Sequence, residues 1–127
     1  MNILLSLELD GLPPTVNLLY RSFRGRRYKT ASGRKYQEQT AKLLRRAWNS
    51  RPPYEEPVQL CIVFTTNNRR KWDMDNRVKA LQDCFSMAGI LKDDKQVEIL
   101  YVERKYGAKQ TTYIEVSSID TAERISE

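Results

Sequence analysis

Four stretches of the chain carry apolar residues in the patterns typical of β-strands. Residues 3–9 alternate in part between apolar and polar side chains, as an opening strand does. Residues 58–66 form a nearly continuous apolar run rich in β-branched residues, and we expect them to be a central strand. Residues 97–106 and 111–116 predict two further strands, joined by a turn at Gly107.

Two other stretches repeat their apolar residues with helical spacing. The first runs from Ser32, a suitable N-cap, to about Asn49; the second begins near Asp75 and ends before Gly89. The expected buried faces are Tyr36, Thr40, Leu43, Leu44 and Ala47 in the first helix, and Val78, Leu81, Phe85 and Ala88 in the second. Residues 15–31 have no clear period and predict an extended or hairpin-like loop.

The order strand, helix, strand, helix, strand, strand predicts an α/β (α+β) fold. We expect a small sandwich with a mixed sheet of about four strands and two main helices. At 127 residues the chain is the length of one domain. The expected domain covers residues 1–118, followed by a charged tail at residues 119–127.

The amino-acid composition limits the kinds of partner, catalytic site and compartment that this chain can have. The formal net charge is +6, from 22 Lys and Arg against 16 Asp and Glu, which favours a polyanionic partner. The chain has no histidine, and this excludes Ser-His-Asp triads and the usual Cys/His zinc sites. Cys61 and Cys84 lie in apolar runs and are expected in the core of a protein from a reducing cytoplasm. No stretch resembles a signal peptide or a membrane span, so we expect a cytoplasmic protein without a membrane partner.

Carboxylates gather in the middle of this basic chain. Asp73 and Asp75 stand two residues apart where the second helix begins, and Asp93-Asp94 follow one helix length later. A cluster of carboxylates repels a phosphate group unless a divalent cation lies between the carboxylates and the phosphate. Mg²⁺ is such a cation, and it prefers oxygen ligands. If the two pairs meet in space, they predict a metal site for phosphodiester chemistry. The alternative is that these aspartates only cap the helix and form a turn, where Asp is common.

The second helix carries further charged residues next to these carboxylates. Lys79 and Asp83 follow Asp75 at steps of four, so the three share one stripe of the second helix.

Basic residues are concentrated in the segment before and within the first helix. Residues 21–48 hold ten Lys and Arg but one acid, Glu38. The residues expected to contact nucleic acid are Arg21, Arg24, Arg26, Arg27, Lys29, Arg69, Arg70 and Lys71. The alternative for this set is an ordinary solvated surface.

Three segments follow one another in an informative order. Residues 13–20 read Pro-Pro-Thr-Val-Asn-Leu-Leu-Tyr, residues 73–79 read Asp-Met-Asp-Asn-Arg-Val-Lys, and residues 88–97 read Ala-Gly-Ile-Leu-Lys-Asp-Asp-Lys-Gln-Val. In order and spacing they resemble the RusA family of Holliday junction resolvases. The resemblance would place a basic residue before the first aspartate, and Trp72 departs from this, so the resemblance does not extend to a DNA contact at that position.

The resemblance implies a homodimeric, Mg²⁺-dependent endonuclease, with Mn²⁺ as a substitute, that cuts four-way DNA junctions symmetrically. It also implies a bacterial or phage-encoded protein. The implied catalytic residues are Asp73, Asp75, Asp94 and Lys79, with the three aspartates as metal ligands. Candidate accessory residues are Asp93, Asn76 and Asp83, and Asn17 and Tyr20 are expected to be structural or close to DNA. Two rivals remain: a DNA-junction-binding module without catalysis, and a nuclease that prefers flaps or forks.

Overall fold

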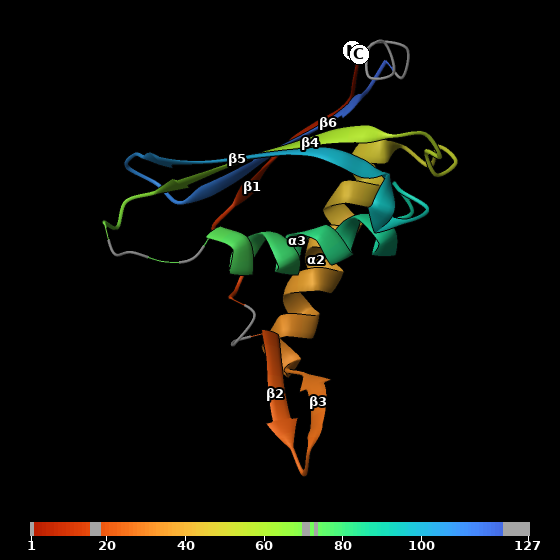
Figure 1. The fold of residues 1–127 in the computed structure, drawn as a ribbon. Coiled ribbons are helices and arrows are strands. Elements are labelled where there is room, and N and C mark those ends of the chain that lie inside the picture. The colour runs from red at the N-terminus through yellow and green to blue at the C-terminus, as the bar shows by residue number, and fades with distance from the viewer. Residues whose placement is uncertain (1, 16–18, 70–71, 73, 121–127) are drawn as a thin grey trace.

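The fold is a two-layer α+β sandwich from which one β-hairpin projects. The computed structural model describes residues 2–15, 19–69, 72 and 74–120. Its elements are β1 (Ile3–Asp10), β2 (Tyr20–Phe23), β3 (Arg26–Lys29), α2 (Ala31–Trp48), β4 (Val58–Thr66), α3 (Met74–Met87), the 3₁₀ helix η1 (Asp94–Gln96), β5 (Val97–Tyr106) and β6 (Thr111–Ser118). Helices α2 and α3 lie together on one face of the sheet (Figure 1). The predicted fold class and the order of the main elements are confirmed, and β2 and β3 form a separate hairpin between β1 and α2.

The main sheet is mixed, with the strand order β1-β6-β4-β5. β5 runs parallel to β4, whereas β6 runs antiparallel to both β4 and β1. The parallel pair is connected through α3, because parallel neighbours need a long crossover. The two strands predicted around Gly107 therefore exist, but they flank β4 and do not pair with each other. The Gly107 N–H donates to the carbonyl of Thr66 at 3.1 Å, where the chain passes the end of β4.

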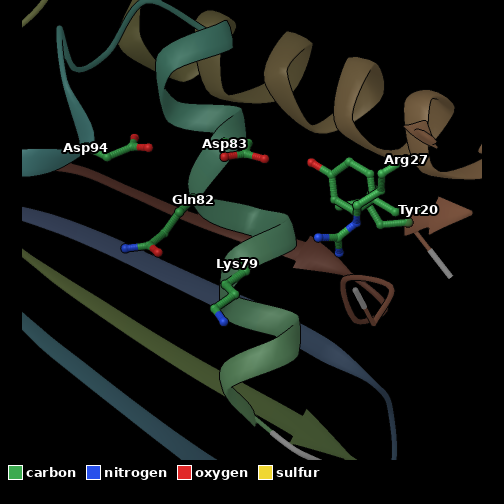
Figure 2. A pocket seen from close by; sticks show the side chains of 7 residues that line it. Tyr20, Arg27, Lys79, Gln82, Asp83 and Asp94 are labelled. Atoms are coloured by element: carbon green, nitrogen blue, oxygen red, sulfur yellow. The ribbon is translucent and has the colours of Figure 1, made fainter. Parts of the chain in front are cut away.

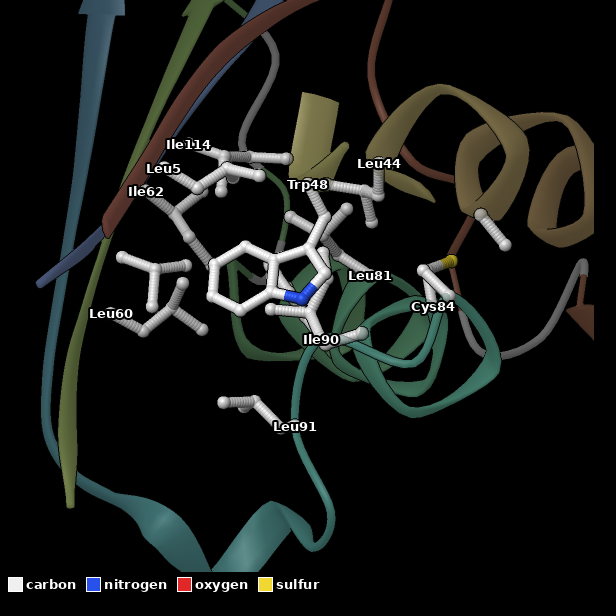
Figure 3. Packing of buried hydrophobic residues seen from close by; sticks show 14 of the residues in the cluster. Leu5, Leu44, Trp48, Leu60, Ile62, Leu81, Cys84, Ile90, Leu91 and Ile114 are labelled. Carbon is white, nitrogen blue, oxygen red and sulfur yellow. The ribbon is translucent and has the colours of Figure 1, made fainter. Parts of the chain in front are cut away.

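The core lies between the sheet and the helices. Along β4, Val58, Leu60, Ile62 and Phe64 are at most 2% exposed and point to the helical side. Figure 3 shows this layer packed around the indole of Trp48. The intervening residues of β4 are only partly buried, and Cys61 is among them. The expectation of a core position is thus confirmed for Cys84, which is fully buried, and wrong for Cys61.

Both helices are found where they were expected, with two corrections in α2. Thr30 caps α2 and Ser32 does not, because the Thr30 hydroxyl accepts the Gly33 N–H at 2.9 Å. Leu43 is 42% exposed and Ala47 is also exposed, whereas Gln37 is fully buried, so the buried face lies to one side of the predicted one. The residues predicted for the buried face of α3 are all buried. Within the described part of the chain, no helix is long and apolar enough to cross a membrane.

Candidate active site and nucleic-acid interface

The exposed stripe of α3 carries the first candidate residues. Asp75 lies in the first turn, where the free N–H groups of the helix favour a negative charge. Its carboxylate is 4.0 Å from the Lys79 ammonium, and the two side chains are 71% and 64% exposed. A solvated pair at that distance is weak, so the lysine stays available to an anionic ligand. Asn76 lies beside them in the first turn and is partly buried.

The turn after α3 gives its two aspartates different roles. Asp93 caps η1: its carboxylate accepts the Lys95 N–H at 2.9 Å, and its own N–H donates to Gln96 Oε1 at 2.9 Å. This reciprocal pair is a capping box and gives Asp93 a structural task. Asp94 accepts a hydrogen bond from the Ser86 hydroxyl at 3.1 Å, which joins the turn to the last part of α3. Asp94 is exposed.

A pocket of about 390 Å³ lies between α3, this turn and the root of the β2–β3 hairpin. Figure 2 shows its side chains arriving from these three elements. Its lining residues are Leu19, Tyr20, Arg27, Lys79, Gln82, Asp83 and Asp94. Two carboxylates and two cations thus share one cavity. Such a lining can bind a phosphate through the cations and a hard cation through the carboxylate oxygens.

A buried amide positions one of these carboxylates. Gln37 of α2 is 0% exposed, and its Nε2 donates to the Ala80 carbonyl at 3.1 Å and to Asp83 Oδ2 at 3.4 Å. The sequence analysis did not select Gln37. The signal that could have found it is its spacing from Gly33, Ala41 and Leu44, which makes it a polar residue on an otherwise small or apolar stripe.

The structure does not bring Asp75 and Asp94 together. Ser86, the partner of Asp94, follows Asp75 by 11 residues, which is about 16 Å along a helix. Oxygen ligands of one Mg²⁺ lie about 2.1 Å from the ion, so two of them are within about 4 Å of each other. Among the described residues, no three acidic or cysteine side chains form a group that could hold a metal ion. Asp73 lies outside the described residues, and its assignment as a ligand stays a prediction.

Trp72 occupies a basic and aromatic setting. Its ring meets Phe64 edge-on at 5.6 Å, and the guanidinium groups of Arg77 and Arg104 lie 4.7 and 5.1 Å from its centre. Arg77 also donates to the Pro13 carbonyl, and this bond ties the Pro-Pro segment to the start of α3. Burial lowers the pKa of the Arg77 guanidinium. The sequence analysis missed Arg77 and Arg104, which only the packing around Trp72 brings into this region.

The β2–β3 hairpin, hereafter the arm, carries most of the residues predicted to contact nucleic acid. Arg21, Arg24, Arg26 and Arg27 are exposed on it and Lys29 is partly buried. Arg27 lies 4.4 Å from the ring centre of Tyr20, which places both at the pocket. Arg69 lies 5.0 Å from the ring centre of Tyr106, at the far end of the sheet's β5 strand. Asn17, Arg70 and Lys71 lie outside the described residues.

Comparison with known proteins agrees with the motifs. The family model for endodeoxyribonuclease RusA matches residues 10–117. The crossover junction endodeoxyribonuclease RusA of Escherichia coli strain K12 is 35% identical over 85 residues, which are 67% of this chain and 70% of that protein. The proteins of the same name from Shigella sonnei and Enterobacteria phage 82 are each 34% identical over the same shares of both chains. The chain therefore belongs to the RusA family of endodeoxyribonucleases.

Proposed function

We propose that this endodeoxyribonuclease resolves four-way DNA junctions with paired, symmetric nicks, as a metal-dependent homodimer. The observation that carries the proposal is the pocket at the root of the basic arm, which Lys79 and Asp94 line together with Tyr20 and Arg27. The relatives are named crossover junction endodeoxyribonucleases, which supports the branched substrate. The cations on the arm favour selection of DNA by the positions of its phosphates, and so by shape and not by base sequence.

We propose Mg²⁺ as the metal, with Mn²⁺ as a substitute. The donor set fits a hard cation, because the chain has no histidine and its candidate ligands are carboxylates. Asp75 would hold the ion together with Asp73, which stands two residues before it in the sequence. When bound, the ion would polarise the phosphodiester and lower the pKa of a water molecule. Lys79, 4.0 Å from Asp75, would place its ammonium on the phosphate and offset the charge that develops there.

We further propose that the third carboxylate comes from the other subunit of the dimer. Within one chain, about 16 Å of helix separates Asp75 from the Ser86 that binds Asp94. In a two-fold dimer the same surface of each subunit faces the other across the axis, so Asp94 of one subunit can complete the Asp75 site of the other. Two such composite sites would give one nick in each of two strands.

The catalytic assignment is tested with Asp75→Asn and Asp94→Asn, with Asp10→Asn as the control. Asp10 is a similarly exposed aspartate that pairs with Lys109 at 3.0 Å on the sheet, away from the pocket. Each site variant should lose at least about 100-fold in the rate of junction cleavage. Junction binding should be kept or strengthened, because a negative charge is removed. Wild-type cleavage rates in both variants would refute the catalytic assignment of these aspartates, and a wild-type protein that binds junctions without cutting them would favour the DNA-binding module.

The composite site is tested by mixing the two variants in one dimer. In a dimer of one Asp75→Asn chain and one Asp94→Asn chain, a shared site would leave one site with both aspartates and the other with neither. The mixed dimer should therefore nick one strand, although each parent dimer is inactive. If each chain forms its own site, both sites of the mixed dimer are damaged and no activity returns. The preferred substrate is settled by comparing four-way, three-way and flap DNA at one salt concentration.

A further inference from the structure

The arm projects from the body as a two-stranded ribbon with almost no packing of its own. Figure 1 shows it extending beyond the first turns of α2, away from the sheet. Its strands pair from Tyr20 with Lys29 at the root to Phe23 with Arg26 at the tip. Every residue from Arg21 to Tyr28 is exposed. Because an isolated two-stranded hairpin is only marginally stable in water, this arm gains little from its own contacts.

The root of the arm, in contrast, is firmly attached. Leu19 is 1% exposed, and its carbonyl accepts the Thr30 N–H at 2.9 Å across the base of the ribbon. The Thr30 hydroxyl caps α2 at the same point. A Cβ on Gly33 would lie 2.7 Å from a methyl carbon of Leu19 and 2.8 Å from its carbonyl oxygen, so the helix and the arm meet without spare room. The fold thus holds an exposed ribbon in a defined direction.

The chemistry of the ribbon fits a polyanion that carries flat apolar faces. Residues 20–29 include five cations and no acid. At the tip, Phe23 is 62% exposed, with the Arg24 guanidinium 5.3 Å from its ring centre. The turn residues Arg24 and Gly25 both have positive φ angles, of 51° and 75°, as a tight two-residue hairpin turn requires. This turn presents the ring at the end of the arm, where the described residues leave it largely uncovered.

The position of the arm relates its tip to the pocket. Tyr20 and Arg27 line the pocket with Lys79 and Asp94. Phe23 lies three residues beyond Tyr20, which is about 10 Å along a strand. Successive base pairs of a duplex are about 3.4 Å apart. The tip of the arm therefore lies about 10 Å, the length of about three base-pair steps, from the Tyr20 wall of the pocket.

We propose that the arm enters the branch point of the DNA and that Phe23 stacks on a base that has lost its neighbour there. The proposal rests on the proposed function, because only branched DNA offers such a base near the pocket. The cations of the ribbon bind the phosphates on either side, while the ring makes the one contact that distinguishes a branch from a continuous duplex. Aromatic rings stack on unpaired bases of any sequence, which suits recognition by shape.

The experiment uses the full-length protein with Phe23→Ala, Phe23→Trp and the control Tyr101→Ala. Tyr101 is an aromatic residue of similar exposure, 51%, on a sheet strand outside the pocket and the arm. Junctions carry 2-aminopurine at one, three or eight steps from the cut, and binding is measured without a divalent metal. The wild type should lower the fluorescence within about three steps, because stacking quenches 2-aminopurine, and leave it unchanged at eight. Phe23→Ala should abolish this decrease and weaken junction binding by about 5- to 150-fold, with duplex affinity unchanged.

The remaining outcomes separate the two proposals. Phe23→Trp should restore both signals, since any aromatic ring can stack, and Tyr101→Ala should behave as the wild type. If Phe23→Ala matches the wild type in fluorescence and affinity while junctions are still preferred and cut, the role of Phe23 is refuted and the proposed function stands. If the wild type neither prefers nor cuts junctions, both proposals are refuted.

Discussion

Replacing Gly33 with alanine should loosen the joint between the arm and α2. The new Cβ would lie 2.7 Å from the Leu19 side chain, 2.8 Å from the Leu19 backbone oxygen and 2.9 Å from the Thr30 hydroxyl. A side chain can rotate away, but the backbone oxygen belongs to the hydrogen bond that closes the base of the arm. The substitution must therefore move the arm or displace the Thr30 cap.

The expected free-energy change combines three effects. Overpacking at a buried position costs about 1 to 3 kcal/mol. Loss of the Thr30 cap adds about 1 kcal/mol. Alanine is favoured over glycine in a helix by about 1 kcal/mol, which offsets the second cost. We expect a net loss of about 1 to 3 kcal/mol in the free energy of unfolding.

Urea denaturation of Gly33→Ala measures this loss, and junction affinity measures the displacement of the arm. Affinity should fall while the far-ultraviolet spectrum stays that of the wild type. A suitable control is Gly11→Ala, because Gly11 has a positive φ angle of 78° but nothing within 4 Å of its added Cβ. That variant should be strained without weakening junction binding. A Gly33→Ala protein as stable as the wild type, or more stable, with full junction affinity would refute the close contact at this joint.

Three further predictions concern caps and a buried thiol. Thr30→Ala should lower the free energy of unfolding by about 1 kcal/mol and Ser32→Ala by much less, because of these two hydroxyls it is that of Thr30 that accepts a helix N–H. Urea titrations in which Ser32→Ala is the more destabilised variant would identify Ser32 as the cap. Asp93→Ala should lower the free energy of unfolding by about 1 kcal/mol but keep most of the cleavage rate, whereas Asp94→Asn should keep the stability and lose the cleavage. Equal losses of cleavage rate in the two variants would contradict these separate roles. Burial raises the pKa of the Cys84 thiol from 9.0 to about 12, so above pH 9 the unfolded chain loses a proton that the folded chain keeps. The thiol's contribution to stability is complete below pH 9 and should fall by up to about 1.4 kcal/mol for each unit up to pH 12, and thermal melts of Cys84→Val should show a shallower decline.

Two features of the candidate site could be predicted from the chain itself. Asp75 and Lys79 were expected to share a stripe of α3, and their side chains are neighbours at 4.0 Å. The bases expected in an extended or hairpin-like segment lie on the arm. The meeting of Asp75 with Asp94, which the predicted metal site requires, is not seen within the chain, because the length of α3 keeps the two ends of the motif apart. Sequence spacing alone contains no information about a distance measured across a fold or between subunits.

Local patterns were enough to define the strands, the helices and their order, because alternation and helical spacing reflect which residues can face a core. They were not enough to decide finer geometry. One residue rotates a helical face by about 100°, so Leu43, which was expected to be buried, is exposed, and Gln37, for which no prediction was made, is buried against α3. Likewise, Thr30 caps α2 because Leu19 holds the base of the arm beside the start of that helix. Strand β4 separates β5 from β6 because α3 returns the chain to the free edge of β4, where β5 pairs. The sequence therefore determined the elements and their chemistry, and packing between distant segments decided which side chains meet.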